Sequence, residues 1–438
     1  MSQDMSTHLI NEVKAFHKEL KKEYPEASFN LKENALSEFE KLGLPDKKEE
    51  IWKYTNASSF LNSNLKLGAP KKAITPQMIE GYLINKDSNR IVFINGNMES
   101  NYTFLNENIS LSIKKESDLP NGFSKDSFGL LNKAMSPEEI FIEIKPNFVL
   151  EEPLEILHLT TLENDSFINC PRVHIKVGSY SKISTLEHFF CEAYEKTPHY
   201  FVNAQTSIIC EEGSSVEHVK CQRDSLKAVH IAEVKAIVKK DSAFKSFTLS
   251  LGANLARNNI SSLLEDTWAH TNIHGLFVIK EDQHCDNYSV IDHKVANTTS
   301  DQLFKGVLDE KSHGVFTGKV IVNPDAQQVN SGQLNKNLLL SKSAKVNTRP
   351  ILEIEADDVK CAHGATIGQI DENQAFYLRT RGVSERKAQE ILCQAFVQEA
   401  LDQISHIGIR KFVSPLVENY FNQFKILDEK TQGANDGN

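Results

Sequence analysis

The sequence predicts a mainly β protein whose core is a solenoid of short strands, flanked by helical domains at both ends. Short runs rich in Val, Ile and Thr recur between residues 138 and 370, and such runs are typical of strands. No helix-length amphipathic stretch lies between them, which argues against a sheet of alternating strands and helices. A large antiparallel sandwich is the alternative that these runs leave open.

A loose internal repeat favours the solenoid over the sandwich. Serine-containing turns precede alternating segments at Ser179, Ser214, Ser242 and Ser343, at intervals of 35, 28 and 101 residues. These intervals indicate a period of about thirty residues, as in solenoids whose coils stack on their neighbours.

The first 75 residues are expected to form a helical domain. Apolar residues recur at helical spacing, and Gly43 and Pro45 should end the second helix. The segment KKEEIWKYTN then offers Trp52 and Tyr54 for packing against the next domain. Residues 76–137 are expected to form a mixed connecting subdomain.

Residues 371–438 are expected to form a C-terminal helical domain with a disordered tail. Ser384 should cap a helix through SERKAQEILCQAFVQEALDQI. Its predicted apolar stripe leaves Cys393 off centre, as a structural residue. The stripe comprises Ala388, Ile391, Leu392, Ala395 and Phe396.

Composition narrows the classes of function. The chain has 438 residues and a formal net charge of −10, which disfavours non-specific binding to nucleic acid or to an anionic membrane. The N-terminus lacks the apolar core of a signal peptide, and no apolar run is long enough to span a membrane. We therefore expect a cytoplasmic protein whose seven cysteines are mostly free and buried.

Several histidines and one glycine-rich run resemble functional motifs but fail their patterns. HGVFTGKV lacks a spacer and the metal-binding hydroxyl of a phosphate loop. His270 and His274 would be about 13 Å apart on a strand, too far to share a metal. His284, Cys285 and His293 fit no zinc spacing. We expect these residues to belong to the strands and turns of the β region.

The candidate site is DDVKCAHGATIG, residues 357–368. Cys361 and His363 are two apart, so on a strand they point to one face. If the alternation of PILEIEA continues through Asp357 and Asp358, that face is the outer one. A bulge there would reverse the register and bury both side chains. Two ligands cannot hold a cluster or a closed zinc site, so this is either no metal site or half of a shared one.

Three segments resemble the SufB/SufD family of the SUF iron–sulfur cluster assembly system, and most closely its D type, SufD. They are KKEEIWKYT, VNTRPILEIEADDVKCAHGATIG and FYLRTRGVSERKAQEILCQAF. The resemblance implies a right-handed parallel β-helix between helical domains. It also implies a non-enzymatic scaffold that pairs with a paralogous SufB subunit through the β-helix ends and binds SufC, an ABC-type ATPase, through its C-terminal helices.

Two departures separate this chain from the B type. Gly364 stands where the B type carries Glu, and Gly332–Asn335 lacks the reactive cysteine of the B type. The D type is implied to contribute His363, and Cys361 as a second candidate, to a transient iron–sulfur cluster completed by SufB. The resemblance further implies that some complexes of the family bind a reduced flavin, but no motif in this sequence indicates its site. It also allows the isolated chain to form a homodimer.

Residues expected at partner contacts follow from the same resemblance. They are Gly364, Arg379, Arg381, Gly382 and Phe396. A cap that closes the solenoid is the alternative role for the C-terminal helices.

Two other functions remain open. A β-helix enzyme acting on polysaccharide would need clustered carboxylates, for which Glu353, Glu355 and Asp357 are candidates. A B-type scaffold would accept persulfide directly.

Overall fold

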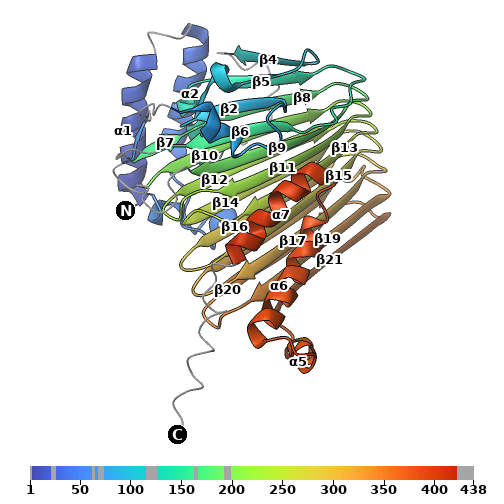
Figure 1. The fold of residues 1–438 in the computed structure, drawn as a ribbon. Helices are drawn as coiled ribbons and strands as arrows, with labels where there is room; N and C mark the ends of the chain where they lie inside the picture. The colour runs from blue at the N-terminus through green and yellow to red at the C-terminus, as the bar shows by residue number, and fades with distance from the viewer. Residues whose placement is uncertain are drawn as a thin grey trace.

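The computed structural model describes residues 2–20, 26–61, 65–67, 74–114, 126–161, 166–191 and 199–421. Figure 1 shows a long stack of strands with helices at its N-terminal end and along one side toward its C-terminal end. The helices are α1 (Ser2–Leu20), α2 (Glu26–Leu42), α3 (Pro76–Glu80), α4 (Ser127–Met135), α5 (Glu372–Thr380), α6 (Glu385–Leu401) and α7 (Ile407–Phe421), with 3₁₀ turns at Glu50–Trp52, Ala57–Ser59 and Ser100–Tyr102. Within the described ranges, none of these helices has the length and apolar character to cross a membrane.

The strands form two sheets, here called sheet A and sheet B. Sheet A has the order β20 (Lys345–Ile354), β18 (His313–Val322), β16 (His284–His293), β14 (Leu255–Leu264), β12 (Val229–Val238), β10 (Phe201–Cys210), β8 (Arg172–Val177), β5 (Glu139–Ile144) and β4 (Ile109–Lys114), with β7 (Phe167–Asn169) beside β10 and β1 (Lys66–Leu67) beside β7. Sheet B has the order β21 (Val359–Gly368), β19 (Val329–Leu339), β17 (Thr299–Leu308), β15 (His270–Ile279), β13 (Ala243–Ser250), β11 (Ser215–Arg223), β9 (Lys182–Cys191), β6 (Leu154–Thr160), β2 (Arg90–Ile94) and β3 (Asn97–Met98).

The chain passes from one sheet to the other at each turn, which makes a parallel solenoid. Val229 of β12 pairs in parallel with Phe201 of β10 and with Leu255 of β14, so one coil takes 28 residues and the next takes 26. The mainly β solenoid between terminal helices is therefore confirmed, and the antiparallel sandwich is wrong because successive strands of each sheet run in parallel.

The serine turns only partly form one column. Ser214 and Ser242 precede paired strands at the same corner of the coil, but the residue aligned with them in the previous coil is Ser181, not Ser179. Ser343 lies at the opposite corner, between β19 and β20. The period of about thirty holds, but the alignment does not, because small polar residues occupy both corners.

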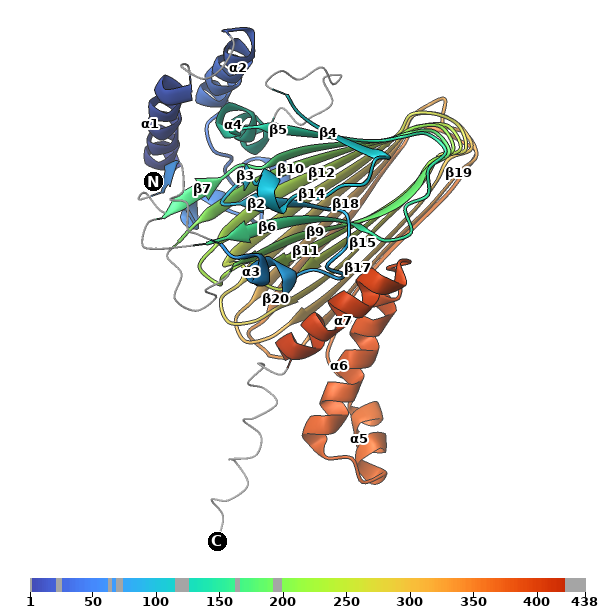
Figure 2. The same cartoon turned by 45° about the horizontal axis from the view of Figure 1, so that its top comes forward.

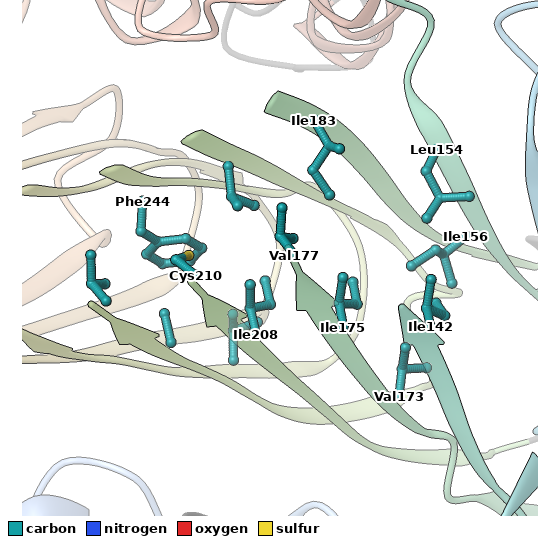
Figure 3. Packing of buried hydrophobic residues seen from close by; sticks show 14 of the residues in the cluster. Ile142, Leu154, Ile156, Val173, Ile175, Val177, Ile183, Ile208, Cys210 and Phe244 are labelled. Atoms are coloured by element: carbon teal, nitrogen blue, oxygen red, sulfur yellow. The ribbon is translucent and has the colours of Figure 1, made fainter. Parts of the chain in front are cut away.

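Alternate residues of each strand fill the inside of the solenoid. Figure 3 shows side chains of both sheets meeting between the layers near the N-terminal coils. The labelled residues are Leu154, Ile156, Ile183 and Phe244 from sheet B and Ile142, Val173, Ile175, Val177, Ile208 and Cys210 from sheet A. Toward the C-terminal coils the inward positions become polar, with Ser289, Gln302 and Gln333 all buried.

The N-terminal helices cover one side of the stack and connect to both sheets. Residues of α1, α2 and α4 share a buried cluster with β10 and β12. Gly43 ends α2 as predicted, with φ of 68° and its N–H donating to Phe39 O at 2.7 Å. β2 pairs in parallel with β6 and β4 pairs antiparallel with β5, so much of the segment 76–137 extends the two sheets.

The C-terminal helices attach to the outer face of sheet B. Residues of α6 and α7 share a buried cluster with β11, β13 and β15, whereas α5 has no buried residue and projects from the solenoid with the start of α6 (Figure 2). Ser384 caps α6, as predicted, by accepting from Lys387 N. Cys393 lies within the buried face, not off its centre. The predicted disordered tail, EKTQGANDGN at residues 429–438, lies outside the described residues.

Candidate functional site

The site lies where the solenoid ends. β20 and β21 are the last strands of their sheets, and among the described strands none pairs with their free edges. The inward side chains of this last coil are therefore only partly covered. We call this end of the solenoid the mouth, lined by Val346, Thr348, Pro350, Leu352 and Ile354 of β20 and by Val359, Cys361, His363, Ala365 and Ile367 of β21.

Cys361 and His363 point into the mouth, so the predicted outward orientation is wrong. They pair in register with Ser331 and Gln333 of β19, and both of those residues are buried inside the solenoid. The alternation of PILEIEA cannot be carried forward, because Asp357 and Asp358 form the turn between sheets A and B. The reversal comes from this corner and not from a bulge within a strand.

The thiol of Cys361 is half-buried at the edge of the core. It packs against a cluster that includes Val329 and Ala356. Burial raises the pKa of the Cys361 thiol, and a backbone hydrogen bond with Ser331 opposes this only in part. Because only the thiolate is a good metal ligand, binding here must release a proton.

Two polar columns run through the interior and end beneath the two candidate ligands. Below Cys361, Ser300 Oγ lies 2.8 Å from Ser331 Oγ and 2.9 Å from His293 Nε2. Below His363, Gln333 Nε2 donates to Gln302 Oε1 at 2.8 Å. The sequence analysis missed these residues, although an offset of thirty residues from Cys361 and His363 leads directly to Ser331 and Gln333.

The mouth has the donor set for a soft metal but too few donors to hold it. A thiol and an imidazole suit iron in iron–sulfur centres. Within the part of the chain that the structure describes, no three His, Cys, Asp or Glu side chains are placed to hold a metal ion. A metal at this pair would need further ligands from another chain.

The rim of the mouth offers apolar surface and an interrupted backbone edge. Ile354 is 40% exposed and Ile367 is 49% exposed. Pro350 has no N–H, and proline is confined in sheets to edge strands or their ends. Gly364 faces the outside, where an added Cβ would meet Leu334 Cδ1 at 3.3 Å.

The other predicted contact residues lie on or near α5 and α6, away from the mouth ligands. Arg379 and Arg381 are exposed, and Arg381 lies over the Tyr377 ring at 5.3 Å. Gly382 has φ of 86° and links the two helices, a conformation that favours glycine. Phe396 is half-buried beneath Lys305 Nζ, 4.2 Å from its ring centroid, so it helps attach α6 to sheet B.

A cavity opens between α5, α6 and the turn after β19. Its volume is about 750 Å³, and its lining includes Leu340, Lys342, Phe376, Arg379 and Gln389. Phe376 is 65% exposed. An exposed aromatic ring beside such a hollow is typical of a docking surface.

His270, His274, His284 and His293 lie in strands β15 and β16, as predicted. His270 Nδ1 lies 2.6 Å from Thr299 Oγ1, and His274 Nε2 lies 3.1 Å from Asp301 Oδ2. His284 points outward while its neighbour Cys285 points inward, so they cannot act together. Of the carboxylates considered for a polysaccharide site, Glu353 lies on β20 and pairs with Lys319 at 2.8 Å, whereas Glu355 and Asp357 lie beyond the end of β20.

The segment KKEEIWKYTN docks onto the outer face of sheet A, as its aromatic residues suggested. The Arg257 guanidinium lies 3.8 Å from the Trp52 ring centroid and pairs with Asp286. Thr55 donates to the same carboxylate, and its Oγ1 lies 2.8 Å from His284 Nε2. This network joins the N-terminal domain to β14 and β16.

Buried neutral histidines make the fold sensitive to acid. Burial lowers the pKa of His284 and of His293 to about 4. Between pH 6.5 and 4 these two histidines therefore bind protons in the unfolded chain but not in the native chain. As a result, the unfolding free energy falls as pH falls. We expect each histidine to contribute about 1.4 kcal/mol per pH unit at most, measured by urea unfolding across this range.

Substitution separates this effect from the titration of carboxylates. His284→Gln should reduce the slope of unfolding free energy against pH between pH 6.5 and 4. His199→Gln, at an exposed position, should leave the slope unchanged. An unchanged slope in His284→Gln would show that His284 already takes up its proton in the native state.

Comparison with known proteins gives two family matches that together cover most of the chain. Residues 159–396 match the model described as SUF system FeS cluster assembly, SufBD core domain. Residues 3–141 match the SufBD protein N-terminal region.

Relatives match over similar lengths. An iron–sulfur cluster assembly SufBD family protein of Synechocystis is 31% identical, over 86% of this chain and 87% of its own length. The iron–sulfur cluster assembly protein SufD of Escherichia coli is 28% identical, over 86% of this chain and 89% of its own. The chloroplastic protein ABCI7 of Arabidopsis thaliana is 28% identical over 66% of this chain.

Proposed function

Because the chain belongs to the SufBD family of the SUF iron–sulfur cluster assembly system, we propose that it is a D-type scaffold without catalytic activity of its own. It contributes His363, together with Cys361, to a nascent cluster that a SufB-like subunit completes. The observation that carries this proposal is the pair of soft donors directed into an open, incompletely covered mouth.

A shared site suits a cargo that must be handed on. Two donors from this chain bind iron weakly, and four are needed to hold a cluster. Closing the mouth against a partner supplies the missing donors, and opening it releases the cluster. The cluster is the cargo of the protein.

The rim supports pairing with a second β-helix. Ile354 and Ile367 are large apolar side chains left exposed at the end of the solenoid, and the uncovered end of a solenoid needs a cap or a partner. We assign this role to a SufB-like paralogue.

The projecting helices support a separate partner. Phe376 and Tyr377 of α5 are 65% and 58% exposed, beside the cavity under α5 and α6. We assign this surface to a SufC-like ABC ATPase, whose nucleotide-driven dimerisation would move α6 and α7 against sheet B and so act on the mouth.

One co-purification experiment tests both contacts, with each variant serving as the control of the other. The chain is co-expressed with its SufB-like and SufC-like partners and purified by a tag on this chain. We expect Ile354→Asp with Ile367→Asp to lose the paralogue and keep the ATPase. Phe376→Asp should lose the ATPase and keep the paralogue, because a buried carboxylate without a partner is costly.

Both variants replace exposed side chains, so we expect unfolding midpoints close to that of the parent chain. Failure of the parent chain to retain either partner would overturn the proposed scaffold role. A chain that by itself accepted sulfur from a persulfide, and assembled a cluster when iron and a reductant were supplied, would act as a B-type scaffold, and the missing thiol in Gly332–Asn335 argues against it.

A further inference from the structure

An amide ladder inside the last coils ends beneath His363. Gln333 Nε2 donates to Gln302 Oε1 at 2.8 Å, and Ser289 Oγ donates to the same oxygen at 3.3 Å. Gln302 Oε1 thus accepts from both sides, whereas Gln302 Nε2 is buried without a partner among the described residues. The side-chain N–H of Gln333 donates to Gln302 on β17. The carbonyl oxygen of Gln333 therefore remains to accept a hydrogen bond from β21.

That oxygen has no donor. Gln333 is 4% exposed, and its Oε1 makes no hydrogen bond with any described residue. A buried carbonyl without a donor is destabilising. The rung above Gln333 is His363, its partner in the β19–β21 register, and strands in a sheet are about 4.8 Å apart. An imidazole N–H is the donor that this position offers.

The opposite sheet keeps the two glutamines in place. Gly318 of β18 faces them, and an added Cβ there would lie 2.2 Å from Gln333 Nε2 and 2.7 Å from Gln302 Oε1. No other residue type fits at 318 while the amides keep this arrangement. Because Gly318 has no side chain, the two amides fit against β18. The backbone of β18 at this position then limits their movement.

We propose that Gln333 is a positioning residue for His363, resting on the proposed function of the mouth. Gln333 Oε1 accepts the hydrogen bond from one ring nitrogen of His363. This fixes a single tautomer of the neutral imidazole and directs the lone pair of the other nitrogen out of the mouth, toward the cluster. Metal-binding histidines commonly donate their second ring N–H to such an acceptor, and its loss typically lowers metal affinity by roughly 10–100-fold.

The first test reads the tautomer of His363 in the isolated chain without any metal. Long-range ¹H–¹⁵N spectra of ¹⁵N-histidine-labelled protein at pH 8 distinguish the two ring nitrogens, and the His363→Asn spectrum assigns the signal. We expect one tautomer in the parent chain and a mixture of both in Gln333→Leu. Gln333→Glu keeps an acceptor at this position and should restore a single tautomer.

A neighbouring variant controls for general disturbance of the strand. Asn335 is also buried on β19, but it faces Ala365. Asn335→Leu removes its hydrogen bond to Phe304 O and should lower stability without changing the tautomer of His363. A His363 spectrum in Gln333→Leu identical to that of the parent chain would overturn the proposal, since a purely structural glutamine would leave it unchanged.

The second test uses Co²⁺ as the probe and the heterodimer with the SufB-like subunit as the protein. We expect Co²⁺ affinity to fall about 10–100-fold in Gln333→Leu and to stay near the parent value in Gln333→Glu. If the parent heterodimer binds no Co²⁺ while Gln333 still sets the tautomer, the proposed function fails and the positioning role stands. If Co²⁺ binds equally well in Gln333→Leu, the positioning role in metal binding is wrong.

Discussion

Replacing His363 with alanine is expected to reduce the iron and acid-labile sulfide of the purified three-chain complex at least tenfold, without loss of any subunit. The side chain is exposed at the mouth, so its removal takes away a ligand and little packing. With one donor fewer, the shared site falls below the four that a cluster requires.

The readout must separate loss of the cluster from loss of the complex. The elution volume and subunit ratio of the anaerobically purified complex should match those of the parent. Activity of a cluster-dependent reporter enzyme in cells should fall in parallel with the iron content. His199→Ala, at an exposed position on the N-terminal side, is the matched control. Normal maturation with His363→Ala would remove the mouth from the mechanism.

The same assay applied to Cys361→Ala distinguishes a cluster ligand from a packing residue. Cys361 packs against the buried cluster that includes Val329 and Ala356, so it contributes to the core as well as offering a ligand. Cys361→Ala with normal iron content would make it a packing residue. Loss of iron with an unchanged unfolding midpoint would make it the second ligand.

The architecture was predictable because it repeats. Runs of β-branched residues at a period of about thirty define a solenoid even when individual serine turns are misaligned. The orientation of Cys361 and His363 was not predictable by counting. Alternation holds within a strand, and Asp357–Asp358 is a corner whose geometry depends on the coil beneath it.

The apolar stripe predicted for α6 is only partly correct, since Ala388 is buried and Phe396 is half-buried, but the buried face is centred elsewhere. Ala395 is exposed and Cys393 is buried, because the C-terminal half of α6 sits on sheet B while its start projects with α5. A helix that leaves the body of the protein does not bury one continuous face. The role of Gln333 could not be predicted from the sequence either, because it depends on His363, which lies thirty residues later and pairs with Gln333 in the next coil.

The KKEEIWKYTN segment gives the largest expected effect on stability. Asp286 accepts from Thr55 and pairs with Arg257, and both Asp286 and Arg257 are almost fully buried. Asp286→Ala leaves a guanidinium without its counter-charge, which typically costs about 3–5 kcal/mol. We expect the segment to detach from sheet A at a lower urea concentration than in the parent chain.

Trp52 reports this detachment directly. The chain has two tryptophans. Trp268 is 63% exposed and Trp52 is 1% exposed, so in a Trp268→Phe background the emission reports Trp52 alone. Its shift to longer wavelength should move to lower urea in Asp286→Ala. Asp292→Ala, on the same strand and paired with Lys294 at the surface, should cost less than about 1 kcal/mol.

A double variant tests whether the loss of stability in Asp286→Ala comes from the unpaired Arg257 guanidinium. Arg257→Met together with Asp286→Leu removes both charges, and replacing a buried ion pair with apolar side chains is often neutral or stabilising. We expect the double variant to unfold at higher urea than Asp286→Ala, although it has lost more polar contacts. If it is instead the less stable of the two, the ion pair itself, and not the avoidance of an unpaired guanidinium, holds the N-terminal segment on sheet A.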